Sequence, residues 1–215
     1  GRRPAGLFHA QPAGPRRVVV SNEHLSEHVR DAEAARRIAR LFGGGAARLR
    51  VVLYLRRQDV VSPELSAEVL LAHAAGVRRL DVLVRPEWEL KDNAVRAYRD
   101  LIRRRGAGEP VAYLLGRKEF YGRDFEVCPS VLIPRPETEL VVDLCKQIAA
   151  SDSPWLVADV CAGCGNLGVT LCCEFDQFQC LMTDISLSAL KLAHRNAEQL
   201  GVGDRTLVCR MALAS

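Results

Sequence analysis

The chain has 215 residues, of which 48% are hydrophobic and 26% are charged, so it can form one large domain or a small domain beside a medium one. Its formal net charge of +4 is too small to indicate a nucleic-acid-binding protein. No stretch holds the ~18 uninterrupted apolar residues of a membrane span, and no apolar signal-peptide core follows the N-terminal arginines. These totals exclude an integral membrane protein and predict a soluble intracellular one.

The N-terminal half predicts a disordered lead followed by helices. Residues 1–24 mix arginine, proline, glycine and alanine, which is typical of disorder, with an arginine-rich mitochondrial transit peptide as the alternative. Apolar spacing then predicts a helical N-terminal domain over residues 25–107. Its first helix is expected over residues 25–41, and the three glycines of "LFGGGAARL" interrupt the pattern there.

A second helix is expected to begin at Ser62, the capping residue, with Pro63 in the first turn, and to end at Gly76. Its buried face is expected to carry Leu65, Val69, Leu70 and His73. The domain's last helix is expected to stop at Gly106 after the arginines at 103–105, which suit the negative end of a helix. We interpret these arginines as a solvated helix end.

A β-hairpin linker is predicted over residues 108–135. The segment "EPVAYLLGRKEFYGRDFEVCPSVLIP" is rich in aromatic and β-branched residues, with a turn at Gly122-Arg123-Asp124. Two prolines, Pro134 and Pro136, then fix the backbone as the chain leaves the hairpin. A helix is expected to begin at Pro136, with Glu137 and Glu139 in its positive first turn.

The remaining residues, 136–215, alternate predicted helices and strands. The strand "WLVADV" is expected to be buried and to run into a glycine turn and a helix, after which "FQCLMTDIS" repeats strand and turn and "LSALKLAHRNAEQLG" repeats helix. Strand, helix, strand and helix in succession predict a parallel sheet of the doubly wound kind. The fold class is therefore α/β, with a helical domain and a hairpin in front of it.

The glycine turn allows three interpretations. Gly163, Gly165 and Gly168 form a G-x-G-x-x-G pattern, and Asp184 lies at the end of the next strand, which is typical of dinucleotide-binding turns. S-adenosylmethionine needs nearly the same geometry but carries no pyrophosphate, and its cationic amino-acid end favours an acid at the end of the first strand, where Asp159 lies. A glycine turn that serves packing alone is the third interpretation.

The cysteines are interpreted as reduced thiols. Five of the eight crowd into the α/β segment, where they serve as small hydrophobes better than as disulfides: Cys161, Cys164, Cys172, Cys173 and Cys180. Cys161 and Cys164 form a C-x-x-C, which is half a zinc site or a redox pair. The adjacent Cys172 and Cys173 supply no second pair of ligands at metal spacing, so no metal site is predicted.

Two motifs together, "EPVAYLLGRKEFYGRDFEVCPSVLIPRPETEL" and "DVCAGCG", resemble those of the release factor glutamine methyltransferases of the HemK/PrmC type. The resemblance runs from about Ser62 to near the C-terminus. It implies a Rossmann-like methyltransferase domain and methyl transfer from S-adenosylmethionine to the glutamine side-chain nitrogen in the Gly-Gly-Gln motif of class 1 peptide chain release factors. It also implies these release factors as partners, no direct nucleic acid or membrane partner, a monomer, and a cytoplasmic location in bacteria.

The resemblance also implies which residues contact the donor. The turn would wrap the methionine part of S-adenosylmethionine with Cys161, Ala162, Gly163, Cys164 and Gly165. Asp184 would bind the ribose hydroxyls and Asp159 would help to position the amino-acid end. Thr138 and Glu139, at the start of the first helix after the hairpin, are further candidate donor contacts.

The family's catalytic motif is absent. An Asn-Pro-Pro-Tyr motif orients the substrate amide in this family, and here no asparagine precedes a proline. The chain stops at "RTLVCRMALAS", the end of the expected third strand, so we expect a truncated and inactive portion of the enzyme, with no catalytic residue and poor solubility. The family also tends to have an acid near the adenine, where this sequence has Arg210 and Met211. The adenine contacts are therefore not predicted.

The alternatives belong to different classes. An adenine-N6 methyltransferase acting on nucleic acid would share the donor fold, although it gives no reason for the hairpin and "IPRPETE". A non-catalytic alternative treats the existing chain as a release-factor-binding module without turnover. A nicotinamide dehydrogenase would account for the glycine pattern alone.

Overall fold

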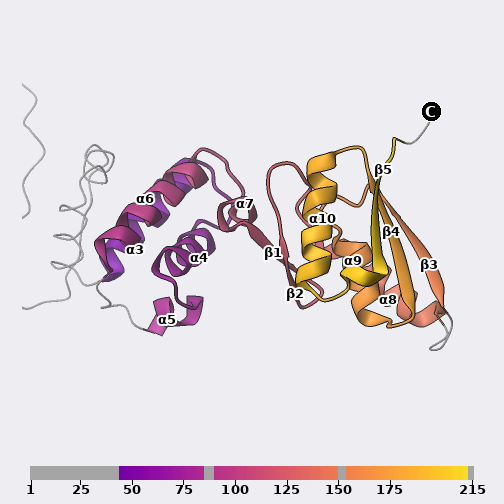
Figure 1. The fold of residues 1–215 in the computed structure, drawn as a ribbon. Helices are drawn as coiled ribbons and strands as arrows, with labels where there is room; N and C mark the ends of the chain where they lie inside the picture. The colour runs from indigo at the N-terminus through magenta and orange to yellow at the C-terminus, as the bar shows by residue number, and fades with distance from the viewer. Residues whose placement is uncertain (1–43, 85–89, 150–153, 213–215) are drawn as a thin grey trace, which may run out of the picture.

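The computed structural model describes residues 44–84, 90–149 and 154–212. In chain order these form a group of helices, a β-hairpin, and a three-stranded parallel sheet with helices against it (Figure 1). The predicted fold class is confirmed. The predicted lead and the helix expected over residues 25–41 lie outside the described residues. Within the described ranges, no helix is both long enough and apolar enough to cross a membrane.

The helical part packs around one apolar cluster. Its helices are α3 (Gly44–Arg57), α4 (Pro63–Ala75), α5 (Arg79–Val84), α6 (Asp92–Gly106) and α7 (Val111–Leu115). Leu55 of α3 and Leu70 of α4 are fully buried at its centre, with Leu101, Ile102 and Leu114 beside them. Burial of these branched side chains is the main force that holds the helices together.

Helix α3 was not predicted. It begins at Gly44, inside the glycine run that the sequence pattern treats as an interruption. Glycine is costly in the interior of a helix, where its conformational freedom is lost. Here two glycines occupy only the first turn, and alanine, leucine and arginine, which favour helix, follow them.

Helix α4 starts and ends where predicted but differs in its cap and its buried face. Ser62 has φ 52°, a left-handed conformation, and its side chain makes no capping hydrogen bond; a side-chain cap requires an extended backbone. Leu65 is 46% exposed. His73 is also exposed, whereas Leu70 is buried as predicted. The other buried residues of the helix are mostly small, because it packs against α3, α5 and α6 and small residues permit close approach: Ser66, Ala67, Glu68 and Ala72.

The arginines at the end of α6 are not simply solvated. Arg104 Nε donates to Glu109 Oε2 at 2.7 Å, and Arg105 donates through a guanidinium nitrogen to the Glu109 carbonyl at 3.1 Å. The hydrogen bond from Arg104 holds the pKa of the Glu109 carboxyl below its ordinary value. These bonds tie the end of α6 to the segment that leads into α7.

The β-hairpin is present, with its turn one residue earlier than predicted. Strands β1 (Arg117–Phe120) and β2 (Arg123–Glu126) pair antiparallel, so Tyr121 and Gly122 form a two-residue turn. Both have positive φ, 52° and 74°, as the turns that match the twist of a hairpin require. The segment before β1, expected as strand, contains helix α7, and the domain boundaries themselves stay predictions.

The α/β part follows the predicted alternation. After the 3₁₀ turn η1 (Pro136–Thr138) come α8 (Glu139–Ile148), β3 (Trp155–Val160), α9 (Asn166–Glu174), β4 (Phe178–Asp184), α10 (Leu187–Gln199), the 3₁₀ turn η2 (Gly203–Arg205) and β5 (Thr206–Arg210). The strands are parallel in the order β3-β4-β5. Their carboxyl ends therefore lie along one edge of the sheet, where ligands of open α/β sheets bind.

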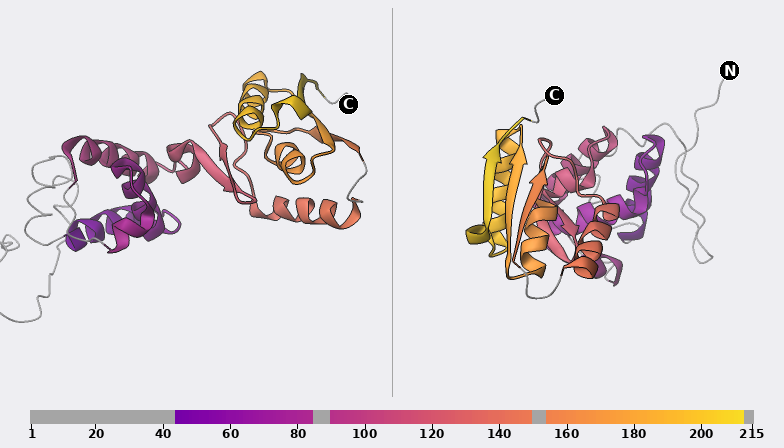
Figure 2. Two further views of the ribbon diagram at one scale, coloured as in Figure 1. Left: turned by 60° about the horizontal axis from the view of Figure 1, so that its bottom comes forward. Right: turned by 90° about the vertical axis from the view of Figure 1, so that its right-hand side faces the viewer.

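Helices α8, α9 and α10 all lie on one side of the sheet (Figures 1 and 2). In the described part of the chain the opposite face is uncovered, so the strand β3 is not buried as predicted. Leu156 is 80% exposed and Leu207 is 67% exposed. Trp155 and Phe178, which are paired on β3 and β4, pack in the core on the helix-covered face. Their rings stack with centroids 5.5 Å apart.

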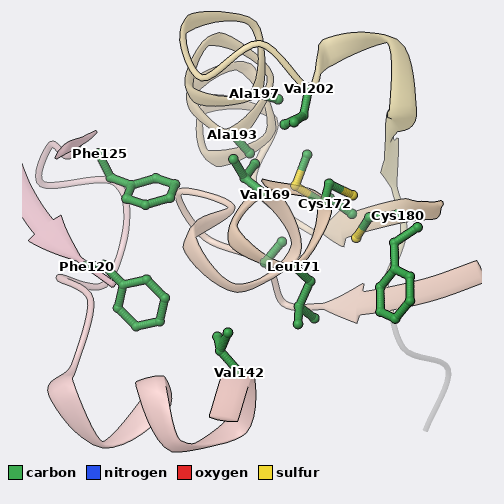
Figure 3. Packing of buried hydrophobic residues seen from close by; sticks show 13 residues of the cluster. Phe120, Phe125, Val142, Val169, Leu171, Cys172, Cys180, Ala193, Ala197 and Val202 are labelled. Atoms are coloured by element: carbon green, nitrogen blue, oxygen red, sulfur yellow. The ribbon is translucent and has the colours of Figure 1, made fainter. Parts of the chain in front are cut away.

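The hairpin is part of the α/β core. Phe120 and Phe125 are 1% and 0% exposed and contact each other edge to face, with ring centroids 6.1 Å apart. They pack in one cluster with Val142 of α8 and Val169 of α9 (Figure 3). Because each buried aromatic ring removes a large apolar area from water, the hairpin is fixed to the α/β part rather than tethered to it.

Polar contacts fix the hairpin turn to α8 and α9. Tyr121 donates its backbone N–H to Glu139 Oε1 at 3.1 Å and its hydroxyl to Asp143 Oδ1 at 2.8 Å. Glu174 of α9 pairs with both Arg123 and Lys146. Burial alone would raise the pKa of Glu174, but the hydrogen bonds from Lys146 and Arg123 outweigh it and lower this pKa below the ordinary value. The start of α8 is therefore set by the hairpin as well as by the prolines.

Candidate functional site

The glycine turn at residues 161–165 joins the ends of β3 and β4. Ala162 donates its N–H to the Thr183 carbonyl at 2.9 Å, and Gly163 donates its N–H to Asp184 Oδ2 at 3.0 Å. The Gly165 N–H closes the turn on the Ala162 carbonyl at 2.8 Å. The structure thus brings together the predicted turn and the predicted carboxylate, which are separate in the sequence.

The three glycines of the pattern are needed for different reasons. Gly163 and Gly165 have φ of 57° and 78°, which L side chains rarely adopt. A β-carbon on Gly165 would also lie 3.3 Å from the backbone of Ala193, whereas one on Gly163 would meet open space. Gly168 lets α9 approach the sheet, because a β-carbon there would lie 2.6 Å from Cys180 Sγ. The open side of Gly163 is the side on which a ligand can approach the backbone.

Cys161 has a positive φ of 62° without being glycine. The left-handed conformation costs an L residue about 1–2 kcal/mol. Glycine would adopt this conformation without that cost, and the side chain of Cys161 is small and exposed.

We expect Cys161→Gly to raise the free energy of unfolding by about 1 kcal/mol, because it relieves this conformational cost while the freer unfolded chain offsets part of the gain. Urea denaturation followed by circular dichroism measures the change. Cys209→Gly, an exposed cysteine in strand β5, is the matched control and is expected to destabilise, since glycine weakens a strand. Destabilisation by Cys161→Gly would contradict the left-handed assignment.

Asp184 uses both carboxylate oxygens to organise the site. Oδ2 accepts from Gly163 and Oδ1 accepts the Ser186 N–H at 2.8 Å. Ser186 in turn caps α10, its hydroxyl accepting the Ala189 N–H at 3.2 Å. Each carboxylate oxygen can accept further hydrogen bonds. The partly exposed carboxylate can therefore hold the turn and still bind a pair of hydroxyl groups.

Asp159 is buried beneath the turn. Its Oδ2 accepts the Gly168 N–H at 3.0 Å, so it fixes the first turn of α9. Burial raises the pKa of its carboxyl, and the hydrogen bond from Gly168 opposes part of that rise. A buried carboxylate whose charge is poorly compensated favours a nearby cation. This chemistry fits the ammonium end of an amino acid.

Cys164 points away from the open side of the turn. The residue is 1% exposed and packs in a cluster with Val127 and Val131 of the segment after β2 and with Leu192 of α10. Burial raises the pKa of this thiol to about 11, so it stays protonated and unreactive. In the described ranges no three His, Cys, Asp or Glu side chains are grouped as metal ligands. Any contact of Cys164 with a ligand would come from its backbone.

Two other predicted contacts lie apart from the turn. Glu139 uses Oε1 to accept the Tyr121 N–H, and Thr138 donates its own N–H to the Arg135 carbonyl at 3.1 Å. Among the described residues, neither has a hydrogen bond to the glycine turn, and their role as donor contacts stays a prediction. Arg210, beside Asp184 on β5, donates from Nε to the Ile185 carbonyl at 3.0 Å.

Asn196 was missed as a site residue. It lies in α10, is fully buried, and donates to the carbonyl of Cys164 in the turn at 2.9 Å. The signal in the sequence is a polar side chain on the apolar face of a helix, three residues after Ala193 and one before Ala197. A buried asparagine requires hydrogen-bond partners from elsewhere in the fold.

Fold and site together define a class of protein. A strand, a glycine turn, a helix, and a carboxylate at the end of the next parallel strand form a Rossmann-like unit that suits an adenosine-bearing ligand. The acid at the end of the first strand, Asp159, suits a ligand with a cationic amino-acid end.

Comparison with known proteins is consistent with this class. Residues 46–116, from α3 to the end of α7, match the family model of the PrmC N-terminal domain. The chain is 40% identical over 156 residues to a release factor glutamine methyltransferase of Nitratidesulfovibrio vulgaris, covering 73% of this chain and 52% of that protein. It is 42% identical over 147 residues to the enzyme of Koribacter versatilis, covering 68% and 52%. The predicted resemblance to release factor glutamine methyltransferases is confirmed, and the chain spans about half the length of these relatives.

Proposed function

We propose that this chain carries the donor-binding part of an S-adenosylmethionine-dependent methyltransferase that modifies release factors. The reaction is methylation of the glutamine side-chain nitrogen in the Gly-Gly-Gln motif of class 1 peptide chain release factors, in the cytoplasm. The observation that carries the proposal is the glycine turn, hydrogen-bonded through Gly163 to Asp184, in a chain similar to proteins named for this reaction.

The residues fit the donor by their chemistry. Asp184 accepts the two ribose hydroxyls with the lone pairs left by Gly163 and Ser186. The backbone of residues 161–165 lines the methionine part, because the open side of Gly163 lets it come close. Asp159 attracts the ammonium group from beneath the turn. The donor, when bound, supplies an electrophilic methyl group on a sulfonium ion.

The acceptor needs groups of another kind. An amide nitrogen is a weak nucleophile because its lone pair is delocalised into the carbonyl, so acceptors must orient the NH₂ group in line with the methyl group. The Asn-Pro-Pro-Tyr motif that does this in the family does not occur in the 215 residues. We therefore assign donor binding to this chain and methyl transfer to a protein of the relatives' full length, with the helical part helping to hold the release factor.

Calorimetric titration of S-adenosylmethionine tests the proposal. We expect saturable binding by the wild-type chain and a loss of about 100-fold in affinity for Asp184→Ala, since two charge-assisted hydrogen bonds are removed. Asp204→Ala, an exposed acid in η2, is the control and should bind as the wild type does. If the folded wild-type chain does not bind S-adenosylmethionine, the donor-site proposal is wrong. If it binds NADH instead, the dehydrogenase alternative is favoured.

A further inference from the structure

Asn196 of α10 uses its whole side-chain amide inside the protein. Nδ2 donates to the Cys164 carbonyl at 2.9 Å and to the Glu126 carbonyl at 3.1 Å. Oδ1 accepts the Glu126 N–H at 2.8 Å. The side chain is 0% exposed, so all three hydrogen bonds are shielded from water. These three hydrogen bonds fix the orientation of the buried amide.

An asparagine at this position is unfavourable locally. Asparagine is a poor residue for the interior of a helix, and burying its amide costs free energy unless every group is paired. Ala193 and Ala197, on either side of it on the same face, are buried apolar residues. The amide therefore stabilises the segments that it joins rather than the helix in which it lies.

The three bonds join two segments far apart in the sequence. Glu126 ends strand β2 of the hairpin, and Cys164 lies in the glycine turn. The Cys164 side chain is held from the same direction, packing on Val127 and Val131, which follow the hairpin. The carbonyl of Cys164 is thus held by Asn196, which is bonded to the end of β2, and its side chain packs against residues that follow β2.

We propose that Asn196 is a positioning residue that couples the hairpin to the glycine turn. By holding the end of β2 and the Cys164 carbonyl on one amide, it sets the conformation of the turn according to where the hairpin lies. The hairpin connects to the helical part through α7. Placement of the helical part on a protein substrate is therefore linked to the shape of the donor site. The functional side of this inference rests on the proposed donor binding.

Amide hydrogen exchange on the full chain tests the coupling directly. Asn196→Ala leaves the Cys164 carbonyl and the Glu126 backbone without their buried partner. We expect the Gly163 and Gly165 amides, which are hydrogen-bonded in the turn, to exchange about tenfold faster or more relative to the β4 amides of Cys180 and Met182. Affinity for S-adenosylmethionine, measured by calorimetry, should fall by about the same factor.

Val202→Ala is the matched control. Val202 is 3% exposed and packs in the main core after the end of α10, so its truncation loosens the fold without touching the amide. We expect it to speed exchange of the turn and of β4 equally and to leave donor affinity unchanged.

The outcomes separate the two proposals. If Asn196→Ala changes the turn and β4 alike, as Val202→Ala does, Asn196 is merely structural and the coupling is overturned. If the turn loosens selectively but the wild-type chain binds no donor, the coupling stands and the proposed function fails. Selective loosening with weaker donor binding supports both.

Discussion

Replacing Phe125 by alanine is expected to lower the free energy of unfolding by about 3–5 kcal/mol, the range for removing a buried aromatic ring from a core. Phe125 is 0% exposed and packs against Phe120 in the cluster that also holds α8, α9 and α10. Because the hairpin has only two short strands, it cannot keep its shape without this contact. Urea denaturation monitored by circular dichroism gives the change in free energy.

Leu65→Ala is the control for this experiment. Leu65 is large and apolar, and the helical periodicity predicts it to be buried, but it is 46% exposed. We expect its truncation to change the free energy of unfolding by about 0.5 kcal/mol or less, as at ordinary surface positions. Equal losses from the two substitutions would mean that α4 buries the predicted face after all. A small loss from Phe125→Ala would mean that the hairpin is detached from the α/β core.

The elements that could be predicted are those with local chemical signatures. The hairpin is marked by Gly122 and by aromatic residues on both sides, and α4 by Pro63 at its start and Gly76 at its end. The strand-turn-helix order and the G-x-G-x-x-G pattern placed Gly163 and Asp184 at one edge of a parallel sheet, and a hydrogen bond of 3.0 Å joins them there.

The features that could not be predicted depend on contacts between distant segments. The buried face of α4 is set by how closely α3, α5 and α6 approach it, which favours Ala67 and Ser66 over Leu65. Glu139 precedes an apolar helix and is well placed for a helix dipole, yet its carboxylate accepts the Tyr121 N–H of the hairpin turn. The residues near Asn196 in the sequence do not predict Glu126 as its hydrogen-bond partner. Periodicity predicts that an element has a buried face, but the neighbours that pack against the element decide which residues form that face.

The site is therefore supported from two directions. From the sheet, Asp159 fixes the first turn of α9 and Asp184 fixes Gly163. From α10, Asn196 holds the Cys164 carbonyl while its amide is also bonded to Glu126 at the end of the hairpin. Ala162, Gly163 and Cys164 of this turn each have a hydrogen bond to a residue outside it, which holds a segment with no periodic structure in one shape. Such preorganisation lowers the entropic cost of binding a flexible ligand.

Alanine at Gly165 is expected to destabilise the protein by about 2–5 kcal/mol, combining about 1–2 kcal/mol for the left-handed backbone with the cost of overpacking. The added β-carbon would lie 2.9 Å from Met182 Sδ and 3.3 Å from the Cα of Ala193. Ala193 belongs to α10, which packs against the sheet, so its backbone cannot move away without disturbing that packing. Urea denaturation measures the loss.

Gly163→Ala shares the left-handed penalty but not the overlap, since a β-carbon there meets nothing within 4 Å. We expect it to cost only about 1–2 kcal/mol in stability and to weaken S-adenosylmethionine binding by about tenfold or more, because the methyl group occupies the space that the donor's methionine part would enter. Calorimetry on both folded variants separates the effects. Wild-type affinity in Gly163→Ala would place the donor elsewhere, since the open side of this glycine is where the proposed site requires close backbone approach.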